Sequence, residues 1–184
     1  HDQQTEMQKE KEDVRILFLD ADGVLNYSSM VYTKPLPLSE EHVKRIGVIV
    51  KAVENCKIAF STSWRLRKNS KKKLKEWLRD VGGIDMETVF IGCTPPPNIR
   101  NPKLMKRSIE IRDFLLSLSK KKQQKMYNVV QYVAVDDIDL LQECNANGDD
   151  ELKQVMNEKH FVLIDGAKGI TDSDVKLVIE LLSS

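Results

Sequence analysis

An apolar run from Val14 to Leu19, interrupted only by Arg15, limits the folds open to this chain. A strand without polar alternation is typical of one covered on both faces, as in the middle of a parallel sheet. Asp20, Asp22 and Gly23 follow it directly, at the carboxyl end where open α/β sheets bind their ligands. The run therefore predicts an α/β fold with a site beside these carboxylates.

Further apolar segments and helical patterns alternate along the rest of the chain. The expected strands are Lys57–Phe60, Val89–Gly92, Tyr132–Val135 and Phe161–Ile164. The expected helices follow an N-cap at Ser39, contain Leu74–Val81 before Gly82, begin near Asn101-Pro102, and follow a cap at Thr171 or Asp172. Such alternation indicates a central parallel sheet flanked by helices, with right-handed crossovers.

Length and composition favour one soluble, globular unit. The chain has 184 residues, 41% hydrophobic and 31% charged. We expect a polar, acidic tail over residues 1–13 and a single domain over residues 14–184. No apolar run approaches the roughly 20 residues that span a bilayer, and the amino terminus does not resemble a signal peptide. A cytoplasmic location is expected, although a dedicated secretion machine can read an unconventional export signal.

Cysteine and lysine patterns carry less information about function. Cys56, Cys93 and Cys144 lack zinc-site spacing and are expected to be buried thiols. Two basic runs stand against a net charge of only +1: Arg65, Arg67, Lys68, Lys71, Lys72, Lys73 and Lys75, and Lys120, Lys121, Lys122 and Lys125. Such runs attract phosphate-bearing partners, but they are also typical of solvated helix faces, and both interpretations stay open.

The first acidic motif suits phosphoryl transfer. Asp20 and Asp22, two apart in an extended chain, would point the same way, and Gly23 lets the backbone turn after them. One carboxylate could attack phosphorus while the other moves a proton, with Mg²⁺ offsetting their repulsion. The alternative is a turn-rich loop after a strand. An EF-hand loop fits poorly because Val24 stands where its third oxygen ligand is needed.

Two later segments offer phosphate-binding groups. Ser61, Thr62 and Ser63 follow the second strand, where a hydroxyl could bind a phosphate oxygen and Arg65 could hold phosphate in a two-pronged contact. The same hydroxyls could instead cap the next helix. Near the start of the helix after Asn101, one of the basic residues could neutralise charge on the transferring phosphoryl group. These basic residues are Lys103, Lys106 and Arg107.

A second pair of acids repeats the design of the first. Tyr132–Val135 is an apolar strand that runs directly into Asp136 and Asp137. Carboxylates at two strand ends are explained together by one shared Mg²⁺ ion. The alternative is that Asp137 caps a helix beginning near Ile138.

Taken in order, these residues resemble the four motifs of the haloacid dehalogenase (HAD) superfamily of phosphohydrolases. Asp20-x-Asp22-Gly23 resembles the first motif, Ser61 the second, Arg107 the third in place of the commoner lysine, and Asp136-Asp137 the fourth. The resemblance spans Ile16 to Leu182 and implies a Rossmann-like HAD fold without a large cap domain.

Several longer segments are similar to the HAD branch named for Swiss-Army-Knife RNA-repair proteins, which also looks related to small HAD-type protein phosphatases. These segments are Leu-Asp-Ala-Asp-Gly-Val-Leu-Asn from Leu19, Ser-Thr-Ser-Trp-Arg from Ser61, Arg107-x-x-Glu110-Ile111, Val-Asp-Asp from Val135, and Gly169-Ile170-Thr171.

The resemblance implies a role for each matched residue. Asp20 would form an aspartyl-phosphate, and Asp22 would protonate the leaving group and then activate water. Mg²⁺ would bind the Asp20 carboxylate, the Asp22 carbonyl and the acidic pair, with Asp137 as the direct ligand supported by Asp136. Ser61 and Arg107 would hold the phosphoryl oxygens. Thr62 is the alternative for the hydroxyl role and Lys106 for the cationic role.

The lack of room for a cap implies an open site and a phosphorylated macromolecule as substrate, because such a substrate brings its own surface to exclude water. Our first interpretation is a monomeric protein phosphatase, for which phosphotyrosine is a plausible substrate. The second is a phosphatase of nucleic-acid ends, with the basic runs on the backbone and Trp64 stacked on a base. The third is a non-catalytic phosphate-binding module.

Overall fold

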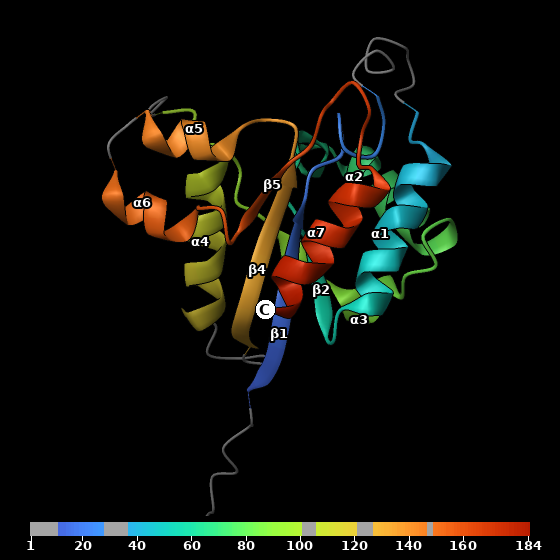
Figure 1. The fold of residues 1–184 in the computed structure, drawn as a ribbon, viewed down its shortest axis with the longest axis horizontal. Helices are drawn as coiled ribbons and strands as arrows, with labels where there is room; N and C mark the ends of the chain where they lie inside the picture. Colours follow the sequence, from blue (N-terminus) through green and yellow to red (C-terminus); the bar gives the residue numbers. More distant parts are fainter. Residues whose placement is uncertain (1–10, 28–36, 101–105, 121–126, 147–148) are drawn as a thin grey trace, which may run out of the picture.

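A five-stranded, all-parallel sheet forms the centre of the computed structural model, which describes residues 11–27, 37–100, 106–120, 127–146 and 149–184 (Figure 1). The strands are β1 (Glu12–Leu19), β2 (Cys56–Phe60), β3 (Phe90–Cys93), β4 (Tyr127–Asp136) and β5 (Phe161–Leu163). Their order across the sheet is β3-β2-β1-β4-β5. The predicted α/β fold is confirmed, and β1 is the central strand.

Helices cover both faces of this sheet. They are α1 (Glu40–Ala52), α2 (Lys68–Asp80), α3 (Met86–Val89), α4 (Arg107–Lys120), α5 (Leu140–Asn145), α6 (Asp150–Val155) and α7 (Asp172–Ser183). A short 3-10 helix, η2 (Ser63–Leu66), precedes α2. Figure 1 shows α1, α2 and α7 on one side of the sheet and α4, α5 and α6 on the other.

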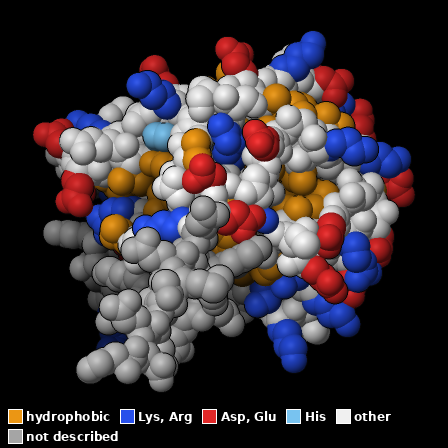
Figure 2. Space-filling model, turned by 90° about the horizontal axis from the view of Figure 1, so that it is seen from below, with side chains coloured by type: hydrophobic (Ala, Val, Ile, Leu, Met, Phe, Trp, Pro, Cys, Tyr) orange, Lys and Arg blue, Asp and Glu red, His pale blue; other side chains and the backbone are white. Residues whose placement is uncertain are grey.

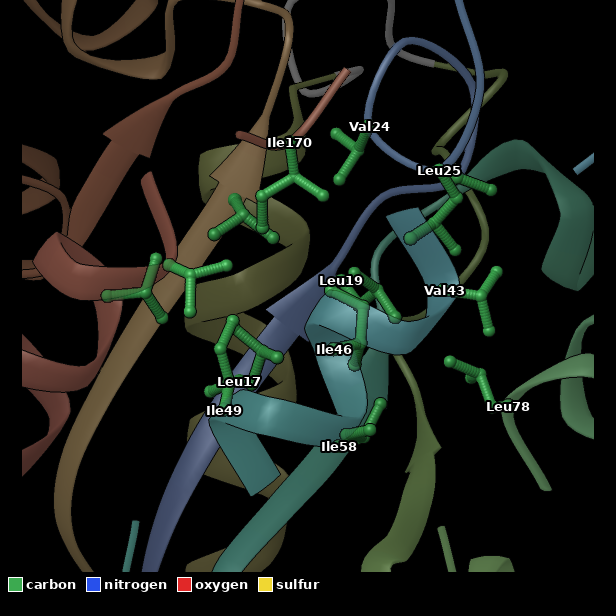
Figure 3. Packing of buried hydrophobic residues seen from close by; sticks show 14 of the residues in the cluster. Leu17, Leu19, Val24, Leu25, Val43, Ile46, Ile49, Ile58, Leu78 and Ile170 are labelled. Atoms are coloured by element: carbon green, nitrogen blue, oxygen red, sulfur yellow. The ribbon is translucent and has the colours of Figure 1, made fainter. Parts of the chain in front are cut away.

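Side chains along β1 point alternately to the two faces of the sheet, and the core is therefore divided into two clusters. Leu17 and Leu19 join the cluster under α1, α2 and α7, whereas Ile16 and Phe18 join the cluster under α4, α5 and α6. Successive side chains of a strand point to opposite faces, so a central strand needs apolar residues at every position. Figure 3 shows Leu17 and Leu19 packed with side chains that include Ile49 of α1.

Two strands begin earlier than the sequence pattern predicts. β1 begins at Glu12, and β4 begins at Tyr127 instead of Tyr132. The two early segments pair with each other, from Glu12 opposite Tyr127 to Val14 opposite Val129. They contain exposed or half-exposed polar residues such as Asn128, and therefore lack the continuous apolar signature of a buried strand.

The sequence did not predict three helices, α3, α5 and α6. Each has only four to six residues, which is too short for apolar residues to repeat at helical spacing. Each begins after an aspartate that accepts backbone N–H groups: Asp85, Asp139 and Asp149. The alternative that Asp137 caps a helix near Ile138 is therefore wrong, since Asp139 is the cap of α5.

Several predictions fall outside the described residues: residues 1–10 of the tail predicted over 1–13, most of the proline-containing loop before Leu38, the helix start at Asn101-Pro102 with Lys103, and the basic run after Lys120. The last two residues of the predicted tail, Glu12 and Asp13, instead begin β1. Within the described ranges no inserted cap domain separates β1 from β2 or β2 from β3. None of the described helices has the length and apolar character to cross a bilayer. Cys56, Cys93 and Cys144 are free thiols, and Cys56 and Cys144 are buried.

At the amino-terminal ends of the strands, the described side chains that are visible in Figure 2 carry charges of both signs. Figure 2 views the molecule from this side, and Lys and Arg side chains there are mixed with Asp and Glu. The carboxyl-terminal edge of the sheet lies at the opposite end of the strands, and the acidic motifs meet there.

Candidate active site

Three carboxylates meet where β1 and β4 end. Leu19 pairs with Val135, so Asp20 and Asp136 come next to each other at the sheet edge, and the Asp20 N–H donates to the Val135 carbonyl over 3.2 Å. Oxygen atoms of Asp20, Asp136 and Asp137 all lie within 4.8 Å of one another. Asp20 and Asp136 are buried and Asp137 is exposed, so the cluster opens to solvent on one side.

Gly23 makes room for the third carboxylate. Its φ of 79° favours glycine, and a Cβ added there would stand 2.2 Å from Asp137 Oδ2. Side chains larger than hydrogen would thus displace the Asp137 carboxylate or the loop that follows β1. The glycine of the Asp-x-Asp-Gly motif therefore serves both the turn and the approach of an acid from β4.

The clustered carboxylates are costly to ionise without a cation. Burial raises the pKa of Asp20 well above its usual range, and the charge of Asp136 raises it further. Burial also raises the pKa of Asp136 to about 6, although the Arg107 charge opposes this shift. Several carboxylate oxygens at close range are the ligand set that Mg²⁺ prefers, and the residues present therefore suit a hard divalent cation.

Arg107, the first residue of α4, brings a positive charge into the cluster. Its Nη1 atom lies 2.8 Å from Asp20 Oδ1 and 2.6 Å from Asp136 Oδ2. The same nitrogen donates to the Ser61 carbonyl over 3.1 Å. Lys106 forms no ion pair with a described residue. The geometry thus favours Arg107 over Lys106 for the cationic role.

Ser61 and Thr62 have different surroundings although they are neighbours. The Thr62 hydroxyl accepts the Trp64 N–H over 3.3 Å and caps η2. Ser61 is 3% exposed, and its Oγ has no hydrogen-bond partner among the described residues. A buried hydroxyl without a partner is uncommon in a folded protein, which marks Ser61 as the hydroxyl available to a ligand.

Asp22 lies apart from the three clustered acids. Its Oδ2 accepts the indole N–H of Trp64 over 3.1 Å, and its Oδ1 accepts from Asn26 Nδ2 over 3.2 Å. Asn26 is fully buried and its Oδ1 accepts the Gly23 N–H over 2.8 Å. The candidate metal-binding cluster therefore contains three acidic side chains and not the side chain of Asp22. Asn26 was missed as a site residue, since its only sequence signal is its place after the first motif.

Two predicted substrate-binding residues are engaged elsewhere. Trp64 is 7% exposed and donates to Asp22, so the expectation that it stacks on a base is wrong. The Arg65 side chain is 6% exposed. Its nitrogens donate to the Thr94, Thr62 and Pro95 carbonyls and to Glu110 Oε2 over 2.7 to 3.0 Å. Arg65 therefore has no free pair of donors for phosphate, and that prediction is corrected.

Residues 16–175 match the family described as the HAD domain in Swiss Army Knife RNA repair proteins. The chain belongs to this family. No curated protein and no solved structure matches it. The match covers every strand of the sheet at least in part and all three clustered carboxylates, and the predicted HAD fold is confirmed.

Because the chain belongs to this family, it is a hydrolase of the phosphatase type. HAD domains generally use a divalent metal. The acidic cluster agrees with that requirement. The name of the family refers to RNA repair.

Proposed function

We propose that the chain is a Mg²⁺-dependent phosphomonoesterase that forms an aspartyl-phosphate on Asp20 and acts on phosphate at nucleic-acid ends. The observation that carries the proposal is the meeting of Asp20, Asp136 and Asp137 with the Arg107 guanidinium. They lie next to the Ser61 hydroxyl, which has no hydrogen-bond partner within the described ranges. Phosphoryl transfer depends on alignment and charge neutralisation, and this arrangement offers both.

In the first half-reaction a carboxylate oxygen of Asp20 bonds to phosphorus, and the bond from phosphorus to the leaving oxygen breaks. Asp22 gives that oxygen its proton. In the second half-reaction Asp22 takes a proton from water, whose oxygen attacks phosphorus, and the phosphorus bond to Asp20 breaks to release inorganic phosphate. Trp64 and Asn26 hold the Asp22 carboxylate, and Ser61 and Arg107 orient the phosphoryl oxygens.

The acidic cluster fits a bound Mg²⁺ through the carboxylates of Asp20, Asp136 and Asp137, and the family resemblance adds the Asp22 carbonyl. The ion supplies charge neutralisation for the nucleophile and the phosphoryl group. Asp137 approaches the cluster only because Gly23 has no side chain. The supporting role of Asp136 is consistent with its direct pairing to Arg107.

For the substrate, the family name favours nucleic acid over the protein that our first interpretation put ahead. The basic start of α2 supports the same choice. Arg67, Lys68 and Lys71 form no ion pair in the part of the chain that the structure describes, and the first turn of α2 has no acid. Cations are unfavourable at a helix amino terminus, so an anionic partner would offset their cost.

A substrate panel tests the proposal. Purified protein with Mg²⁺ is given a generic aryl phosphate, a phosphate-ended oligonucleotide and a phosphotyrosine peptide, with chelator and Asp20→Asn as controls. We expect hydrolysis that both controls abolish, with kcat/KM highest for the oligonucleotide. A higher kcat/KM for the phosphotyrosine peptide would contradict the nucleic-acid proposal and support the protein-phosphatase interpretation. Inert wild-type protein would support the binding-module interpretation, and preference for small sugar phosphates would contradict an open site.

A further inference from the structure

We propose that Arg65 and Glu110 are positioning residues, a buried ion pair that fixes the first turn of α4 and so sets the Arg107 guanidinium against Asp20 and Asp136. The inference rests on the proposed function, because its consequence is the rate of phosphoryl transfer. It gives Arg65 a role other than the phosphate contact expected from the sequence.

Arg65 connects η2 with the segment after β3 and with α4. From η2 it donates to the Thr94 and Pro95 carbonyls in the segment after β3, over 3.0 and 2.9 Å. It also bonds Glu110 Oε2 of α4 over 2.9 Å. A planar guanidinium with several fixed donors holds such partners in one orientation, which a lysine ammonium would not do.

Glu110 transmits this constraint to Arg107. The two residues stand three apart in α4, so their side chains are neighbours on one helix face. Arg107 points to the carboxylates, and Glu110 points to Arg65. If the first turn of α4 rolled or slid, the contacts of 2.8 and 2.6 Å between Arg107 and its two carboxylates would be lost.

Burial indicates that the pair serves geometry more than stability. The side chains of Arg65 and Glu110 are 6% and 9% exposed. A buried ion pair is often no more stabilising than apolar residues of the same volume, because both charges lose their water. What the pair supplies is a directional connection between the Ser61 segment and the helix that carries Arg107. Catalytic geometry has to be held within about 0.5 Å, and such support is therefore consequential.

A double-mutant cycle tests the inference on aryl phosphate with saturating Mg²⁺. Glu110→Gln is combined with Arg107→Ala. If Glu110 acts through Arg107, Glu110→Gln lowers kcat at least about tenfold in wild type and less than about twofold in the Arg107→Ala background. Equal losses in both backgrounds would overturn the proposal. Arg112→Gln breaks the exposed pair with Asp113 on the same helix and serves as the matched control, with no expected effect on kcat.

A second readout does not depend on turnover. The Arg107 side-chain N–H signal in NMR, assigned by its loss in Arg107→Lys, should be sharp in wild type and broadened in Glu110→Gln. An unchanged signal would contradict the proposal.

Arg65→Lys keeps the charge and replaces Glu110→Gln if that variant does not fold. Wild-type protein without phosphatase activity would reject the proposed function, whereas active wild type with independent losses would reject only the positioning role.

Discussion

A side chain at position 23 is disfavoured for two reasons, and substitutions at two different glycines can distinguish them. Its φ of 79° strains any residue with a Cβ, and the Cβ would also meet Asp137. Gly83 has a similar φ of 67° but has no atom within 4 Å of an added Cβ. The two glycines therefore share the backbone demand and differ in the contact with the acidic cluster.

We expect Gly23→Ala to weaken Mg²⁺ binding by at least about tenfold, because Asp137 is displaced, while Gly83→Ala leaves the affinity unchanged. Each variant should lose about 1 kcal/mol or more of stability through the strained φ. Isothermal titration with Mg²⁺ gives the affinities, and denaturant unfolding gives the stabilities. Equal Mg²⁺ affinities for both variants would exclude the role given to Gly23.

The raised pKa of Asp136 predicts that the stability of the metal-free protein depends on pH. Its pKa is raised to about 6, mainly by burial. Between the usual carboxyl pKa of about 4 and that value the folded state binds more protons than the unfolded state, so this group makes stability fall as pH rises. We expect Asp136→Asn to make this fall shallower without abolishing it, because burial also raises the pKa of Asp20. Thermal unfolding with chelator between pH 4 and pH 7 measures it, and identical slopes for both proteins would contradict the shifted pKa.

At the scale of elements, the start of α7 supports the loop that follows β1. The Ile170 N–H donates to the Val24 carbonyl over 2.8 Å, and Thr171 and Asp174 form a capping box immediately after it. Gly169, with a φ of 68°, lets the chain pass His42 of α1. The Gly169-Ile170-Thr171 segment noted in the sequence therefore braces the loop that carries Asp22 and Gly23.

We expect Thr171→Ala to lower the free energy of unfolding by about 1 kcal/mol, since the α7 N-cap is lost. Ser39→Ala is the matched control, because Ser39 is the N-cap of α1 but its side chain makes no capping hydrogen bond. Urea unfolding of both variants measures the difference. Equal losses would show that the capping box is not what stabilises α7.

At the scale of the whole molecule, the basic side chains at the start of α2 follow directly on η2, which contacts Asp22 through Trp64. They are exposed or half-exposed. At the opposite end of the sheet, the described side chains that are visible carry charges of both signs (Figure 2). A phosphodiester strand with its end at the acidic cluster could thus run along the start of α2.

We expect Lys68→Gln/Lys71→Gln to weaken oligonucleotide binding and to reduce the slope of log affinity against log salt by about 1.4, the value for two lost contacts to a single strand. Hydrolysis of a small aryl phosphate should not change. Lys51→Gln/Lys176→Gln, on α1 and α7, removes the same charge away from η2. If both pairs changed the slope equally, the effect would be one of net charge alone.

The sequence allowed prediction of the sheet, the principal helices and the strand-end acids, because each depends on a local pattern or on where a strand ends. The roles of Trp64 and Arg65 did not follow in the same way. The direction in which these two side chains point depends on the turn of η2. It also depends on partners such as Glu110, which is 45 residues away from Arg65 in the sequence. Likewise no local signal separates Ser61, whose hydroxyl has no partner in the described part of the chain, from Thr62, which caps a helix.

The covalent intermediate on Asp20 is the most direct test of the whole account. Asp22→Asn keeps the nucleophile but cannot activate water, so it should accumulate the intermediate from an aryl phosphate, whose leaving group departs without a proton from Asp22. This variant is incubated with Mg²⁺ and a substrate carrying labelled phosphate, quenched in acid and digested, and the labelled peptide is identified by mass spectrometry. We predict one hydroxylamine-sensitive label on Asp20, absent after Asp20→Asn. Label on another residue, or wild-type hydrolysis that Asp20→Asn leaves intact, would contradict the account.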